Sequence, residues 1–123
     1  MAPIAAHLKV LNSLLYIRDA TIKNLPKIDG NGAVWSTPSC LAVSCMPDCD
    51  GATEIVIGST SEISGLNGML LFEGNLSTPS RHVIVESVLG QQILKTNVSN
   101  STTPIRVLTN GRRDTDKIIV SLG

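Results

Sequence analysis

Aromatic residues are almost absent from this sequence, which has one Trp, one Tyr and one Phe among its 123 residues. Surfaces that bind sugars or single-stranded nucleic acids use aromatic rings as stacking platforms. Three rings cannot supply such a platform and also fill a hydrophobic core. The core must therefore consist of Leu, Ile and Val, and a stacking surface is excluded.

A net charge is also missing, because 10 basic residues balance 10 acidic ones. A neutral chain lacks the positive field that holds a phosphate backbone, so we expect no nucleic-acid partner. Near-zero net charge favours self-association, which makes a homodimer plausible.

The sequence has no evident targeting or membrane-spanning segment. Residues 1–17 carry Lys9 within their apolar part, have no basic region before it, and are too short to cross a bilayer. The number of cysteines is odd, which agrees with a reducing compartment. We therefore expect a cytoplasmic protein without membrane contact, folded as one domain over residues 1–123.

Catalytic motifs are lacking as well. The two histidines, His7 and His82, lie in no nucleophile motif, and the sequence has no G-x-S-x-G, P-loop, G-x-G-x-x-G or H-E-x-x-H pattern. General base catalysis usually needs a His beside an orienting carboxylate. The sequence therefore predicts a protein that is not an enzyme and that carries no cofactor.

Three cysteines, Cys40, Cys45 and Cys49, are the weak metal-ligating candidates of the chain. Their C-x4-C-x3-C spacing differs from the paired spacing of a closed zinc site, and Cys40 and Cys45 would face opposite sides of one strand. We predict no metal and interpret the cysteines as small buried apolar residues. A Cys45–Cys49 disulfide is the alternative in an oxidising setting.

Short runs of β-branched residues dominate the second half of the chain and predict an antiparallel meander. These runs lie at residues 83–85, 92–94, 105–108 and 118–120. Residues 39–58 alternate on both sides of a tight turn, which predicts a β-hairpin. Strands at 33–36 and 69–73 bring the count to about eight. This pattern indicates an all-β fold, a mainly antiparallel β-sandwich of about eight short strands.

Residues 5–18 admit two interpretations. Ile4, Leu8, Leu11 and Leu15 recur with the period of an amphipathic helix, which predicts a short N-terminal helix. Residues 18–23 instead fit a strand that continues from Tyr16. The residues alone leave helix and strand open.

The densest charge cluster follows a strong turn pair, Asn110-Gly111. Its members are Arg112, Arg113, Asp114, Asp116 and Lys117. We predict that Arg112, Arg113, Asp114 and Asp116 form a binding loop for an anion or a charged partner, since loops carry binding more often than strands do. The alternative is a solvated turn with local charge pairing.

Three further segments carry a resemblance to a known family. They are Gly32-Ala33-Val34-Trp35, Arg81-His82-Val83-Ile84-Val85-Glu86-Ser87 and Ile105-Arg106-Val107-Leu108. Their order resembles that of small bacterial β-sandwich proteins of the competence J or nuclease-inhibitor type. The resemblance implies a strand at residues 8–17 and, for function, the binding and inhibition of a partner protein. It assigns no site residue.

With catalytic motifs, a positive field and a stacking surface all missing, the features left to carry a function are the shape of the molecule, its loops and its strand edges. Such features bind proteins. The sequence therefore predicts a non-enzymatic protein-binding module of the inhibitor or immunity type. Three alternatives stay open, of which a metal-dependent protein built on Cys40, Cys45 and Cys49 is the first. The second is a sandwich that binds a small molecule in an aliphatic pocket between its sheets, and the third is a structural subunit of an oligomer.

Overall fold

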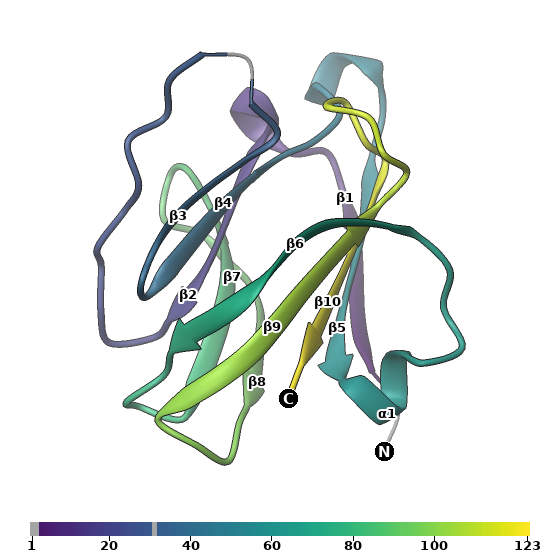
Figure 1. Cartoon of the computed structure of the whole chain (residues 1–123). Helices are drawn as coiled ribbons and strands as arrows, with labels where there is room; N and C mark the ends of the chain where they lie inside the picture. Colours follow the sequence, from purple (N-terminus) through teal and green to yellow (C-terminus); the bar gives the residue numbers. More distant parts are fainter. Residues whose placement is uncertain (1–2, 31) are drawn as a thin grey trace.

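The computed structural model describes residues 3–30 and 32–123, and over these ranges the chain forms ten strands in two packed sheets (Figure 1). The first sheet contains, in spatial order, β1 (Ile4–Leu8), β5 (Thr53–Ser59), β10 (Lys117–Leu122), β9 (Thr102–Thr109) and β6 (Met69–Ser77). The second contains β3 (Val34–Thr37), β4 (Cys40–Ser44), β2 (Leu14–Asp19), β7 (His82–Ser87) and β8 (Gln92–Asn97).

Seven of the eight strand pairings are antiparallel, and the eighth joins β5 and β10 in parallel. The predicted all-β, mainly antiparallel sandwich is confirmed. The strand count is two higher than expected, because residues 4–19 contribute two strands, β1 and β2, that the expected eight did not include.

The space between the sheets is filled by aliphatic side chains. Alternate residues of the central strands point inward and are almost fully buried, as the period of two along a strand requires. These include Leu15, Ile17, Leu41, Val43, Ile55, Ile57, Val83, Val85, Val107, Ile118 and Val120. In β4, Leu41 and Val43 belong to this core, whereas Cys40 and Ala42 do not.

The N-terminal segment is neither a helix nor one strand. β1 and β2 are separated by a 3₁₀ turn at Leu11–Ser13, in which Asn12 and Ser13 have φ values of 58° and 55°. The turn carries the chain from the first sheet to the second, so a single strand at residues 8–17 was wrong. β2 also ends at Asp19, short of the predicted continuation to residue 23.

Two predicted connections are corrected by the sheet order. β4 and β5 belong to different sheets, so residues 39–58 are not a hairpin. The C-terminal meander is two separate hairpins, β7–β8 in the second sheet and β9–β10 in the first. The strands themselves were predicted correctly from the alternation of their side chains. Alternation does not show whether the next strand pairs in the same sheet or crosses to the other sheet.

A short helix, α1 (Thr60–Ile63), covers the outer face of the first sheet. A capping box begins it: Glu62 N donates to Ser59 Oγ at 3.3 Å, and Ser59 N donates to Glu62 Oε1 at 2.8 Å. Ile63 packs with the buried Val56 and Ile119 of the sheet. The sequence prediction had only an irregular connection here. No described helix has the length and apolarity needed to cross a membrane.

Candidate protein-binding surface

Five connections meet at one end of the sandwich, which we call the loop end. They are residues 9–13, 45–52, 88–91 and 110–116, together with the last part of the long loop between β2 and β3. The strand register brings them together, since Leu14 at the start of β2 lies opposite Ser44 at the end of β4, and Leu15 lies opposite Ser87 at the end of β7. Helix α1 and the chain's C-terminus lie at the opposite end (Figure 1).

Exposed apolar side chains gather at the loop end. Seven large hydrophobic residues of the described chain are exposed, and five lie here: Leu11, Ile28, Met69, Leu70 and Leu89. Leu89, in the turn between β7 and β8, is 73% exposed, and Met69 is 63% exposed. Scattered apolar residues are normal on a protein surface, whereas five of these seven share one end of the sandwich, which makes this end the candidate for binding a protein.

The predicted charged loop forms the connection between β9 and β10, and Arg112, Arg113, Asp114 and Asp116 are all exposed in it. It is a seven-residue connection rather than a two-residue Asn-Gly turn. Arg112 Nε donates to Asp114 Oδ1 at 3.1 Å, and the Arg112 amide donates to Asn110 Oδ1 at 2.8 Å. The buried Thr115 hydroxyl donates to the Lys117 carbonyl at 2.8 Å. These bonds give the loop a defined shape.

Contacts with the second sheet hold the same loop in place. Ser44 Oγ donates to the Arg113 carbonyl at 2.8 Å, and the Met46 amide donates to the Thr115 carbonyl at 2.9 Å. Arg113 Nε donates to the Gly32 carbonyl at 3.2 Å. These three bonds hold the loop in one shape, and a loop that is already ordered loses less entropy when it binds.

A groove of about 440 Å³ lies between the charged loop, the 3₁₀ turn and the β2–β3 loop. Asn12, Ser13, Leu14, Ile28, Trp35, Ser44, Cys45, Pro47, Arg113 and Asp114 line it. Trp35, the single tryptophan of the chain, donates from Nε1 to the Asp29 carbonyl at 2.9 Å. Composition alone gave no reason to place this ring beside Arg113, because about 80 residues separate them in sequence.

The cysteines do not come together. Cys45 belongs to the core between the sheets, Cys40 is buried on the outer face of the second sheet, and Cys49 is exposed. Burial raises the pKa of Cys40 to about 12 and that of Cys45 to about 11, so both remain protonated thiols at neutral pH. In the described chain no three His, Cys, Asp or Glu side chains are placed to hold a metal ion.

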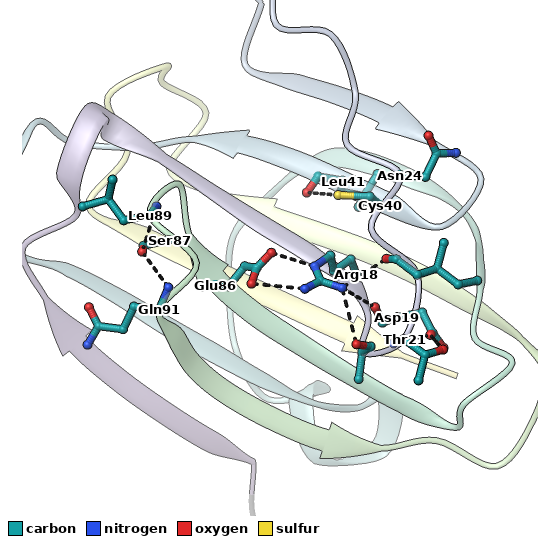
Figure 2. A network of polar contacts seen from close by, with 12 residues as sticks. Arg18, Asp19, Thr21, Asn24, Cys40, Leu41, Glu86, Ser87, Leu89 and Gln91 are labelled. Atoms are coloured by element: carbon teal, nitrogen blue, oxygen red, sulfur yellow. Dashed lines mark hydrogen bonds and ion pairs between the residues drawn. The ribbon is translucent and has the colours of Figure 1, made fainter.

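The outer face of the second sheet carries a polar network that sequence reasoning missed (Figure 2). Arg18 donates from Nε to Glu86 Oε1 at 2.6 Å and from Nη2 to Glu86 Oε2 at 3.3 Å, and both side chains are about nine-tenths buried. Arg18 Nη1 also donates to the carbonyls of Asp19 and Ile22, at 3.0 and 3.1 Å. The network therefore fixes the start of the β2–β3 loop, which crosses this face.

Asp19 extends the network to a loop from the far half of the chain. Its carboxylate accepts bonds from the amide and hydroxyl of Thr21, at 2.8 and 2.7 Å, and of Ser80, at 3.0 and 2.8 Å. Burial alone would raise the pKa of Asp19, but these four bonds outweigh it and lower the pKa. Every donor is within the protein, so we assign the network to the fold rather than to a ligand.

Packed side chains occupy the space between the sheets, where the small-molecule alternative expected an aliphatic pocket. Sixteen buried residues form one packed cluster between the sheets. One hollow, of about 560 Å³, lies at the end of the sandwich near α1 and is lined mainly by Ser, Thr and Asn. The histidines bear on the question of a general base. Among the described residues, His82 Nδ1 lies 2.6 Å from the amide oxygen Oδ1 of Asn97, and no His side chain is hydrogen-bonded to a carboxylate.

No protein-family model and no curated protein sequence matches this chain. Its class is nevertheless defined by the fold, a two-sheet β-sandwich with a preorganised loop end. The chain is similar to the crystal structure of ComJ, inhibitor of the DNA degrading activity of NucA, from Bacillus subtilis. The TM-score is 0.72, the match covers 97% of this chain and 93% of ComJ, and the sequences are 9% identical. The fold is therefore of the ComJ type, as the resemblance of the three segments predicted.

Proposed function

We propose that this protein is a non-enzymatic inhibitor that binds a partner enzyme, a nuclease, through its loop end. The observation that carries the proposal is that five of the seven large exposed apolar side chains share the loop end with a charged loop held in one shape. Apolar anchors next to fixed polar groups are the usual composition of a protein-binding site. The ComJ-type fold supports the inhibitor role, since ComJ inhibits a nuclease.

The charged residues of the loop have a defined part in this proposal. Arg112, Arg113, Asp114 and Asp116 contribute complementarity and steering at the rim, while the exposed apolar residues supply most of the affinity. The described groups offer no acid–base pair of the kind that catalysis would use, which supports a binding role.

The test is an assay of DNA degradation. The purified protein is titrated into NucA from Bacillus subtilis, and separately into the DNA-degrading fraction of an extract of its own source organism. We expect stoichiometric inhibition in at least one assay. Leu89→Ser should weaken inhibition about tenfold, because it removes the most exposed apolar side chain of the loop end. Ile4→Ser is the matched control, since Ile4 is 39% exposed at the opposite end.

Two results would contradict the proposal. The first is unchanged DNA degradation in both assays at high molar excess of folded protein. The second is equal loss of inhibition in Leu89→Ser and Ile4→Ser, which would move the contact surface away from the loop end.

We further propose that the protein acts in the bacterial cytoplasm and that it can pair with a second copy. Its three cysteines are free thiols, which suits a reducing compartment. For pairing, β6 offers the longest edge, a nine-residue strand that starts with the exposed Met69 and Leu70. Such an edge can continue a sheet across a two-fold axis. Light scattering over a range of concentrations tests this, and a monomer throughout would refute it.

A further inference from the structure

We propose that the groove between Trp35 and Arg113 binds an extended acidic segment of the partner, with one apolar side chain inside the groove and a neighbouring carboxylate on Arg113. This proposal rests on the protein-binding role proposed above and adds the chemistry of the bound segment. Three observations support it: the residues that line the groove, the positive charge of Arg113, which has no counter-charge among the described residues, and the strained backbone at the rim of the groove.

The groove combines an apolar wall with a polar rim. Leu14, Ile28, Trp35 and Pro47 line it with apolar surface, and Ile28 is 40% exposed. Its volume of about 440 Å³ holds an aliphatic side chain and part of the backbone that carries it, but is small for a folded element. Trp and Arg are the residue types that most often dominate binding energy at protein interfaces.

The charges around the groove select the sign of the ligand. Asp114 lies 3.1 Å from Arg112, which compensates its charge. Arg113 forms no ion pair with any residue that the structure describes, and only its Nε is used, on the Gly32 carbonyl. A guanidinium held through Nε has two terminal NH₂ groups left, and these match the two oxygens of a carboxylate. The leftover charge in the groove is therefore positive.

The backbone at the rim is strained in a way that shapes the groove. Asn12 and Ser13 are consecutive non-glycine residues with positive φ, a conformation that costs free energy and is concentrated at binding sites. The Ser13 carbonyl accepts the Cys45 amide at 2.9 Å, which fastens this rim to the groove floor. Rim, floor and charged loop are thus each fixed before a partner arrives.

The single tryptophan makes occupancy of the groove measurable without knowing the partner. Intrinsic fluorescence of this protein reports Trp35 alone among tryptophans. The probes are two blocked hexapeptides, one of alternating leucine and glutamate and one of alternating leucine and lysine. We expect the glutamate peptide to change Trp35 emission saturably at millimolar concentration or below, and the lysine peptide to bind at least about threefold more weakly.

Neighbouring residues supply matched controls. Arg113→Gln should weaken the glutamate peptide about three- to tenfold, whereas Arg112→Gln, the same charge change one residue away, should alter it less than about twofold. Ile28→Ala should weaken both peptides, whereas Leu25→Ala should not, since Leu25 is 37% exposed on the same loop but does not line the groove.

Three results would overturn the inference: no saturable change with either peptide, tighter binding of the lysine peptide, or equal effects of Arg112→Gln and Arg113→Gln. The two proposals fail separately. Peptide binding without nuclease inhibition would retain the groove and reject the nuclease partner. Inhibition that survives Arg113→Gln and Ile28→Ala undiminished would retain the inhibitor and reject the groove.

Discussion

The outer faces of the two sheets are covered by opposite means. Over the first sheet, α1 and the residues after it form a small apolar cluster, in which Ile63 packs on Val56 and Ile119. Over the second sheet, the β2–β3 loop is tied down by the buried Arg18–Glu86 pair. The sandwich therefore has an apolar cover over the first sheet and an ionic cover over the second, and each cover is formed by one connecting segment of the chain.

Because one cover is apolar and the other ionic, the two should respond differently to mutation. An apolar cluster tolerates imperfect geometry because its stabilisation scales with buried area. A buried ion pair requires that every charge and donor finds its partner, since one partner left alone in the interior is strongly destabilising. The ion pair lies over the sheet whose covering loop buries little apolar surface: Pro26 is its buried residue, whereas Leu25 and Ile28 are exposed.

The largest expected effect is at the ionic cover. Glu86→Ala should lower the free energy of unfolding by about 3–5 kcal/mol, because it leaves the Arg18 guanidinium buried without a counter-charge. Urea denaturation measures this loss. Arg106→Ala is the control: its pair with Glu73 spans 2.8 Å, but the side chains are 52% and 60% exposed, so the loss should be under about 1 kcal/mol.

A double variant sharpens the same comparison. Arg18→Met combined with Glu86→Leu removes both charges and should lose less free energy of unfolding than Glu86→Ala alone. Equal losses in Glu86→Ala and Arg106→Ala would show that burial of the first pair contributes nothing, and the contrast between the two covers would then fail.

A smaller effect is expected at the apolar cover. Ile63→Ala should lower the free energy of unfolding by about 2 kcal/mol, since Ile63 is buried in a cluster of only a few residues at the sheet surface. The loss should not depend on salt or on pH between 4 and 8, because no charge is removed. A loss as large as that of Glu86→Ala would contradict the proposed difference between the covers.

The smallest effect is expected at Asp19, whose carboxylate makes the stability of the fold at the ionic cover depend on pH. Its pKa is lowered in the folded protein, so its carboxylate stabilises the fold above the unfolded-state pKa of about 3.9. That stability is lost as pH falls from about 4 through the lower, folded-state value. Asp19→Asn should cost about 1–2 kcal/mol at neutral pH and flatten the acid limb of the stability curve. An unchanged acid limb would refute this role.

Particular residues show how far local pattern carried the prediction. Ile55 and Ile57 alternate with polar or outward residues, and the strand that contains them was predicted correctly because alternation is a local property. Helix α1 was missed because it has four residues, too few for a periodic signal. Arg18 and Glu86 were missed because they are 68 residues apart, and nothing local marks either as buried.

At the candidate site too, the local feature was predicted from the sequence and the non-local feature was not. The exposed loop with Arg112, Arg113, Asp114 and Asp116 was predicted from its turn pair and charge, and it lies between β9 and β10 as expected. The groove was not predicted, since Trp35, Ile28 and Arg113 come from three separate connections. Their meeting depends on strand order, which the sequence pattern does not contain.

Local sequence pattern was enough to predict an all-β chain with an aliphatic core and a charged loop before the last strand. Composition and alternation suffice for these because each is decided within a few residues. The pattern also predicted three buried cysteines, which is right for Cys40 and Cys45 but wrong for Cys49, which is exposed. The sheet that each strand joins, the covering of the outer faces and the residues that meet at the loop end depend on contacts between distant segments. Because both inner faces contact one core, a strand's alternation is satisfied equally in either sheet. Non-local pairing decides between them.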